Sequence, residues 1–272
     1  MNELKNIESI EKIKYELSKI DDNAKQKRVT RFIVSALGSI PWIGGFFGAS
    51  STLSAEIEQG KVNDLHQLWI KEHQRKIDEL TFTLFQIVEK LESSEVDISE
   101  RIESPEYLNL VRKGFKEWDN AETSEKKEYI RKLLTNACTS SLSTDDLIRL
   151  YIDWIKQYNE LHFLIIKEIY KSTGITRGEI WNNLNPTNPK ENSIEADLYS
   201  LIFRDLSTGG IVRQHRETDY YGNFIKKTTR KPKSATYKSV FDNTDQYELT
   251  ELGKQFVHYT MTEVVTKIED KK

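Results

Sequence analysis

The chain is organised around residues 32–55, FIVSALGSIPWIGGFFGASSTLSA. This stretch has no charged residue, although 31% of the whole chain is charged. As one continuous helix it would be about 36 Å long at ~1.5 Å per residue, which is enough to cross a hydrocarbon core of about 30 Å. Its glycines and Pro41 disfavour a straight helix, because Gly and Pro cost about 1 and 3 kcal/mol in a helix interior. The sequence therefore predicts a Gly-rich hydrophobic hairpin of two short helices that meet at residues 39–42.

Three interpretations of residues 32–55 stay open from the sequence: a buried part of a helical core, a membrane-active segment, and an oligomer interface. The serines make the stretch less apolar than an ordinary spanning helix, whereas its small residues suit helices that assemble in a membrane. A basic run before it, ending at Arg31, would suit anionic lipid. If the hairpin enters a membrane, we expect it to do so conditionally and as an oligomer, through the residues around the bend: Ile40, Pro41, Trp42, Ile43, Gly44, Gly45, Phe46 and Phe47.

The composition allows one large domain or two small ones, because 272 residues with 37% apolar content can bury a sizeable core. A net charge of −3 favours no class of partner, so local charge has to decide that question. The single cysteine, Cys138, excludes an internal disulfide and a cysteine-based zinc site, and its apolar neighbours predict a buried packing role. The first 31 residues are too polar for a secretory signal. We therefore expect a bacterial cytoplasmic protein, with inner-membrane association on activation if the hairpin inserts.

Helical spacing of apolar residues predicts a mainly α protein, with a helical bundle over residues 1–158 that includes the hairpin. The long central helix, residues 61–92, has the 3-4-3-4 spacing of helix-on-helix packing at Ile77, Leu80, Leu84, Ile87 and Leu91. Polar residues 93–105 predict a connecting loop. Further helices are predicted at residues 105–118, 124–138 and 145–171, the last with a bend at Asn159 or Glu160.

The pattern changes over residues 159–272. A first helix is followed by a short second helix that starts with a capping box, formed by Thr176 and Glu179. A third helix, residues 194–206, leads into a β-like segment and a long basic hairpin whose second strand is residues 246–249. A last helix follows this strand.

This order of elements resembles the winged-helix fold, in which three helices are followed by a β-wing. The resemblance covers residues 160–260 and is carried by ITRGEI at 175–180, LSTGGIV at 206–212 and YELTELG at 247–253. The phrase Leu-Thr-x-Leu-Gly after a wing strand is similar to that of winged-helix regulators. The resemblance implies a winged-helix domain, α with a small β-wing, at residues 159–272, and it says little about the ligand.

The predicted basic hairpin is the candidate binding site. Between residues 211 and 238, eight Lys or Arg stand against two acidic residues, a local charge of +6 in a net-negative chain. Lys and Arg supply phosphate affinity and aromatic side chains stack on unpaired bases, so this composition favours nucleic acid or an oligonucleotide. A solvated flexible hairpin, and a protein or lipid partner, stay open as alternatives. The candidate contact residues are Arg177, Arg204, Arg213, Arg216, Tyr220, Tyr221, Phe224, Lys226, Lys227, Arg230, Lys231 and Lys233.

The sequence has no pattern that is typical of an enzyme or a cofactor site. It lacks a P-loop, a G-x-G-x-x-G, an H-E-x-x-H and a G-x-S-x-G. The five histidines are scattered, and acidic pairs such as Asp145–Asp146 fit helix caps better than paired acid–base work. We therefore expect a protein that is not an enzyme and that holds no cofactor and no metal.

The layout also resembles bacterial abortive-infection (phage-defence) effectors, in particular the α-helical family Abi-alpha. The uncharged segment, YIRKLL at 129–134 and LSTDD at 142–146 carry this resemblance, whereas the His-Pro element of that family is absent. The resemblance implies no catalytic residues. The expected function is an antiviral defence effector in which a winged-helix domain senses nucleic acid or an oligonucleotide and the hairpin acts on the membrane as a pore-forming homo-oligomer. The alternatives are a soluble winged-helix DNA-binding regulator, dimerised through its N-terminal helices, and a helical adaptor that contacts only proteins.

Overall fold

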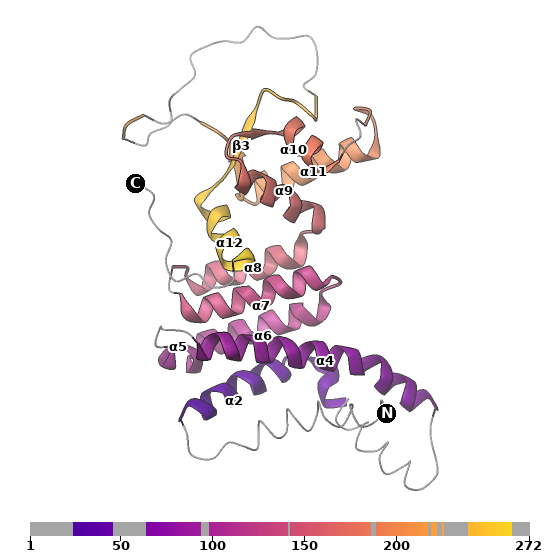
Figure 1. Cartoon of the computed structure of the whole chain (residues 1–272), viewed down its shortest axis with the longest axis vertical. Coiled ribbons are helices and arrows are strands. Elements are labelled where there is room, and N and C mark those ends of the chain that lie inside the picture. The colour runs from indigo at the N-terminus through magenta and orange to yellow at the C-terminus, as the bar shows by residue number, and fades with distance from the viewer. Residues whose placement is uncertain are drawn as a thin grey trace. The chain divides into compact units, whose positions relative to one another are not determined.

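The computed structural model describes residues 24–45, 64–93, 98–140, 142–185, 189–216, 219–221, 225 and 239–262. Within these residues the chain is mainly helical, and three strands form one small antiparallel sheet (Figure 1). The predicted mainly α class with a small β part is therefore confirmed. The chain divides into two compact units, which we call unit 1 (Met1–Lys156 with Tyr259–Lys272) and unit 2 (Gln157–His258).

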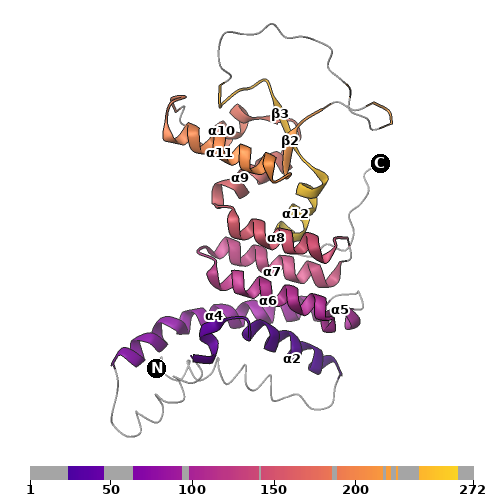
Figure 2. The same cartoon turned by 180° about the vertical axis from the view of Figure 1, so that it is seen from behind.

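Unit 1 is a stack of helices. Its helices are α2 (Ala24–Leu37), α4 (Asp64–Glu92), α5 (Ser99–Glu103), α6 (Pro105–Asn120), α7 (Ser124–Thr139) and α8 (Asp145–Gln157). Helix α7 packs on α6 and α4, whereas α2 packs on α6 and α5. Figures 1 and 2 show α6, α7 and α8 as successive layers, and ion pairs Lys113–Asp153 and Lys156–Glu117 join α8 to α6.

Helix α4 confirms the heptad spacing of the central helix. Its residues Ile77, Leu80, Leu84, Ile87 and Leu91 are all buried, with at most 4% of their surface exposed. The described helix starts at Asp64, and residues 61–63 of the predicted range lie outside the described residues.

The loop that we predicted over residues 93–105 contains a short helix, α5. Ile102 is buried at its centre, and the Arg101 guanidinium donates to the Asp145 carboxylate and to the Ala137 carbonyl oxygen, the latter at 3.2 Å. These tertiary contacts give a short polar segment a helical conformation that its composition alone does not predict. Ser104 then caps α6, where it accepts a hydrogen bond from the Tyr107 N–H.

Residues 32–45 form part of the core of unit 1. Phe32, Ala36, Ile40 and Ile43 are 0–5% exposed. The Phe32 ring lies edge-on to Phe115 of α6, with 6.2 Å between the ring centroids. The predicted break is present, because α2 ends at Leu37 and the helix resumes only at residues 41–45.

The remainder of the hydrophobic stretch, residues 46–55, lies outside the described residues and includes Phe46 and Phe47. Among the helices that the structure does describe, none combines the length and the apolar character that crossing a bilayer requires. The structure therefore decides between the three interpretations only for residues 32–45, which pack as core. The function of the whole stretch, residues 32–55, stays a prediction.

Unit 2 combines helices with the small sheet. Its elements are α9 (Glu160–Lys171), β1 (Ile175–Thr176), α10 (Arg177–Leu184), α11 (Ile194–Thr208), β2 (Val212–Gln214), β3 (Gln246–Leu249) and the first part of α12 (Glu251–Met261). The sheet order is β1-β3-β2, with Ile175 opposite Tyr247 and Val212 opposite Leu249. Helix α9 packs on β3, α10 and α11. The predicted bend is confirmed at Asn159, which caps α9 through a hydrogen bond from the His162 N–H.

Two local patterns of the sequence have a clear structural role in unit 2. Thr176 and Glu179 form the predicted capping box at the start of α10. In the Leu-Thr-x-Leu-Gly phrase, the Thr250 hydroxyl donates to the Gly210 carbonyl oxygen at 2.6 Å and accepts from the Gly253 N–H at 3.0 Å. A Cβ atom at Gly253 would lie 2.4 Å from the Ile211 carbonyl oxygen, so only glycine lets α12 approach the chain before β2 this closely.

Candidate nucleic-acid interface

The candidate interface is the connection between β2 and β3, residues 215–245. Its first arm continues the sheet, because the His215 N–H donates to the Gln246 carbonyl oxygen at 2.8 Å. The Gln214 side chain donates to Asp245 at 3.0 Å across the same end of the hairpin. The antiparallel pairing of β2 with β3 therefore fixes where the connection leaves the sheet and where it returns to it.

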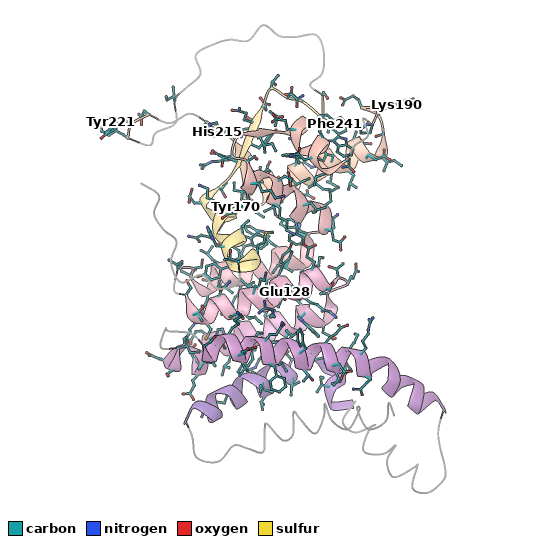
Figure 3. All side chains as sticks on the ribbon, viewed as in Figure 1. Glu128, Tyr170, Lys190, His215, Tyr221 and Phe241 are labelled. Carbon is teal, nitrogen blue, oxygen red and sulfur yellow. The ribbon has the colours of Figure 1, made fainter. Side chains whose placement is uncertain are left out.

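The returning arm, residues 239–245, is held against α10 and α11. The Ser239 hydroxyl and the Val240 N–H both donate to the Glu191 carboxylate just before α11. The ring of Phe241, which Figure 3 labels, packs on Trp181 of α10, with 4.8 Å between centroids, and stacks on Tyr199 of α11 at 5.6 Å. The ring contacts anchor the base of the connection.

Gly178 permits this packing at the start of α10. A Cβ atom at this position would lie 2.6 Å from the Phe241 carbonyl oxygen and 2.0 Å from the Asn243 side-chain oxygen. The returning arm therefore lies directly over the first turn of α10, where no larger residue fits.

Glu248 of β3 joins the two basic groups nearest the sheet. Its carboxylate accepts from the Arg213 Nε–H at 2.7 Å and lies 2.6 Å from His215 Nδ1. Burial alone would raise the pKa of Glu248, but the hydrogen bonds from His215 and Arg213 and their charges outweigh it and lower that pKa below its ordinary value. Arg213 is therefore held by an internal carboxylate, which weakens its expected contribution to phosphate binding.

The lowered pKa of Glu248 predicts a pH dependence for unit 2. A carboxyl group whose folded pKa is lowered stabilises the fold above its unfolded pKa, and this contribution is lost as the pH falls through the folded pKa. The stability of unit 2 should therefore decline as the pH drops below 4.5, the ordinary glutamate value. In urea titrations at several pH values, Glu248→Gln should be less stable than wild type near neutrality and should lose less stability on acidification. The matched control is Glu251→Gln, an exposed glutamate paired with Lys254; parallel curves for wild type and Glu248→Gln would contradict the assignment.

The outer part of the connection exposes aromatic side chains. Tyr220 is 97% and Tyr221 is 84% exposed, and their rings lie edge to face with 5.6 Å between centroids. Figure 3 shows Tyr221 well away from His215 and Phe241, which lie close to the sheet and to α10. Arg216 is also exposed on the connection. The other predicted contact residues of this segment lie outside the described residues: Phe224, Lys226, Lys227, Arg230, Lys231 and Lys233.

The two predicted contact residues on helices lie apart from this aromatic pair. The Arg177 guanidinium packs over the rings of Phe203, at 4.6 Å, and Tyr247, at 5.1 Å. Its environment is that of a packed cation–π contact rather than a free basic group. Arg204 is exposed on α11. The structure therefore brings together only part of the predicted contact residues. Arg213, Arg216, Tyr220 and Tyr221 lie on the same hairpin. Arg177 and Arg204 lie elsewhere and stay predictions.

Helix α11 has a surface that the sequence reasoning did not single out. Three acidic residues, Glu195, Asp197 and Asp205, outnumber its one basic residue, Arg204. Ile194, Leu198 and Leu201 are exposed on it, and their i, i+4, i+7 spacing was the signal in the sequence. An acidic, apolar helix is poorly matched to the phosphates of a duplex, so the charge of unit 2 favours the hairpin over α11 as the nucleic-acid contact.

Two observations bear on metal binding and on the chemistry of the cysteine. Within them, no three His, Cys, Asp or Glu side chains come together as metal ligands. Cys138 is buried in α7, as its apolar neighbours predicted, and burial raises the pKa of its thiol to about 12. A thiol with such a pKa is almost entirely protonated near neutrality and is a poor nucleophile.

Comparison of the chain with protein-family models, with curated proteins and with solved structures found no match.

Proposed function

We propose that this chain is a non-enzymatic nucleic-acid-binding protein, in which unit 2 is a winged-helix module that binds through the β2–β3 connection. The order α9-β1-α10-α11-β2-β3 and the sheet order β1-β3-β2 support the first part, because three helices followed by a β-hairpin is the order that the resemblance implies. The observation that carries the second part is the pair of exposed tyrosines, Tyr220 and Tyr221, within residues 211–238, which have a local charge of +6.

The proposed mode is binding of an unpaired strand. Lys and Arg residues beyond Tyr221 contact phosphates, while the tyrosine rings stack on bases that are free of a partner strand. Arg213 contributes little, because Glu248 already holds it. The acidic residues of α11 disfavour insertion of that helix into a duplex groove, which distinguishes this mode from recognition by a helix.

The phosphate part of the proposal predicts a steep salt dependence. Each phosphate contact contributes to the slope of log K against log salt, by about 0.7 for a single strand. Lys226→Ala/Lys227→Ala should therefore weaken oligonucleotide binding and flatten the slope by roughly 1.4. Fluorescence anisotropy with a labelled single-stranded oligonucleotide, titrated at several salt concentrations, measures both. Binding that is absent, or that does not depend on salt, would remove the proposal.

The stacking part is separable from the phosphate part. Tyr220→Ala/Tyr221→Ala should weaken single-strand binding by about 1–3 kcal/mol per stacked base and leave the salt slope unchanged. The matched control is Tyr170→Ala, which removes another exposed tyrosine of unit 2 (44% exposed), on α9 away from the connection (Figure 3). Equal effects of the two changes would show that the tyrosine pair has no special role.

Membrane action of residues 32–55 is the second candidate function. The uncharged run favours it, whereas the buried Ile40 and Ile43 mean that residues 32–45 would first have to separate from α6. In the combined form, which corresponds to a defence effector, nucleic-acid binding by unit 2 is the trigger for this release. The combined form rests on the first proposal, whereas the first proposal stands even if the membrane step is wrong.

Dye release from anionic liposomes tests the membrane step, with and without oligonucleotide. Gly44→Asp is the sharpest variant, because Gly44 is exposed and a Cβ atom there would meet no atom within 4 Å. The variant should therefore fold normally and release less dye than wild type, because a charged side chain opposes insertion. If wild type releases no dye under either condition, the membrane step is lost and the nucleic-acid proposal stands.

A further inference from the structure

The exposed face of α11 carries three apolar side chains and, near its C-terminal end, Asp205, whose carboxylate lies 3.7 Å from His162 Nε2. Ile194 is 83%, Leu198 40% and Leu201 39% exposed, and at ~100° per residue these three side chains lie within one narrow sector of the helix. The opposite face of α11 is also apolar, since Ala196, Tyr199, Ile202, Phe203 and Leu206 are buried in unit 2. A surface helix is normally polar on its outer face, so the exposed sector is an unpartnered apolar surface.

Two opposite charges flank this surface on one side. Asp197 and Arg204 are seven residues apart, which places them on the same flank of α11, about 20° from one another and ~10.5 Å apart along the axis. That separation is too long for a direct ion pair within one helix. Among the described residues, neither the Asp197 carboxylate nor the Arg204 guanidinium forms an ion pair. Leu198 lies on the other flank.

We propose that α11 pairs with α11 of a second copy of the chain, antiparallel and about a two-fold axis that passes between Ser200 and Leu201. In an antiparallel two-fold pair, each flank meets the same flank of the other copy. Asp197 of each copy then faces Arg204 of the other, which gives two reciprocal ion pairs. The two Leu201 side chains meet at the axis, and each Leu198 lies on the opposite flank, about 7.5 Å from its mate along the axis.

The positions of the charges select this arrangement. A parallel pair would set the Asp197–Arg204 flank against the Leu198 flank and leave both charges without an opposite charge. The antiparallel arrangement gives Asp197 and Arg204 each an opposite charge and covers the three exposed apolar side chains at the same time, while Asp205 keeps its contact with His162. The surface is self-complementary, which is the property that an isologous dimer requires.

The expected affinity follows from the size of the contact. A helix of 15 residues is about 22 Å long, so one helix face buries less than the roughly 1,600 Å² of a standard interface. We therefore expect a reversible dimer with a dissociation constant in the micromolar range. This pairing is independent of nucleic-acid binding, and it assigns Arg204 to a protein interface.

A disulfide experiment with the full chain tests the geometry. Leu201→Cys places a thiol next to its symmetry mate, whereas Glu195→Cys places one on the same helix but, by the helix rise, about 16 Å from its mate along the axis. Cys138 is buried and unreactive, so it adds little background. Under mild oxidation, Leu201→Cys should give a covalent dimer and Glu195→Cys should give almost none. Equal cross-linking of the two variants, or none with either, would overturn the pairing.

A charge exchange tests the ion pairs. Asp197→Arg and Arg204→Asp each place like charges opposite one another, and each should raise the dimer dissociation constant about tenfold, measured by sedimentation equilibrium. The double variant restores opposite charges and should return to within about threefold of wild type. Circular dichroism verifies that each variant is folded. A wild-type chain that stays monomeric at several hundred micromolar, or a dimer whose dissociation constant no α11 variant changes, would overturn the proposal.

Discussion

Replacing Phe32 with alanine is expected to lower the free energy of unfolding of unit 1 by about 4 kcal/mol, because Phe→Ala in a packed core loses the transfer free energy of the ring and leaves a cavity. Phe32 is fully buried, and its ring lies against Phe115. Urea denaturation followed by circular dichroism measures the loss, and hydrogen exchange read by mass spectrometry locates it in α2 and α6. The result distinguishes a segment that stabilises the core of unit 1 from a weakly packed segment that detaches at little cost.

The matched control is Val34→Ala in the same helix. Val34 is 55% exposed, so its truncation should change the free energy of unfolding by less than about 0.5 kcal/mol. If Phe32→Ala lowered the free energy of unfolding as little as Val34→Ala, residues 32–45 would contribute little to the stability of unit 1. That result would support the interpretation of the stretch as a detachable segment. The expected large difference instead means that membrane insertion has a high energetic cost unless something displaces α2.

Gly253→Ala is expected to destabilise unit 2 by about 3 kcal/mol, at the upper end of overpacking effects. The added Cβ atom would lie 2.4 Å from the Ile211 carbonyl oxygen and 3.1 Å from the Ile211 side chain. A backbone carbonyl cannot rotate away, because Ile211 O accepts from the Thr250 N–H at 2.9 Å. Relief would require moving α12 away from the chain before β2. Urea denaturation of the full chain, monitored by the exchange of β2 and β3 amides, measures the effect.

Gly210→Ala separates this clash from the cost of backbone conformation. Gly210 has φ +75°, and a Cβ atom there would meet no atom within 4 Å. Alanine at this position should therefore cost only about 1 kcal/mol, from the left-handed conformation. If Gly253→Ala proved no worse than Gly210→Ala, the close approach of α12 to Ile211 would not be a real constraint on the fold.

Local patterns were the part of the fold that the sequence predicted well. The heptad spacing of Ile77 to Leu91, the capping box of Thr176 and Glu179, and the bend at Asn159 each depend on residues close together in the chain. Helix periodicity and capping are local properties, so a single sequence reveals them. Helix α5 was missed for the opposite reason, because the contacts that stabilise it reach Ala137 and Asp145.

For the candidate site, the sequence predicted the types of residue but not their contacts. The basic and aromatic residues of the hairpin were visible in the sequence, and the exposed Tyr220 and Tyr221 agree with that description. The partners that hold the base of the hairpin were not visible, because Glu191, Trp181 and Glu248 lie far from their contacts in the chain. The packing of Arg177 over Phe203 and Tyr247 was hidden for the same reason.

The uncharged residues 32–55 show most clearly what the sequence determines and what the tertiary structure determines. The sequence by itself determined that this stretch has no charge and must break near Pro41, since composition and helix propensity are properties of the residues alone. Only the tertiary structure decided where its first part goes: Phe32, Ile40 and Ile43 are buried, and the Trp42 Nε1–H donates to Asp119 of α6 at 2.8 Å. Apolar side chains leave water equally well for a membrane or for a protein core, and it is the complementary surface of α6 that selects the core for residues 32–45.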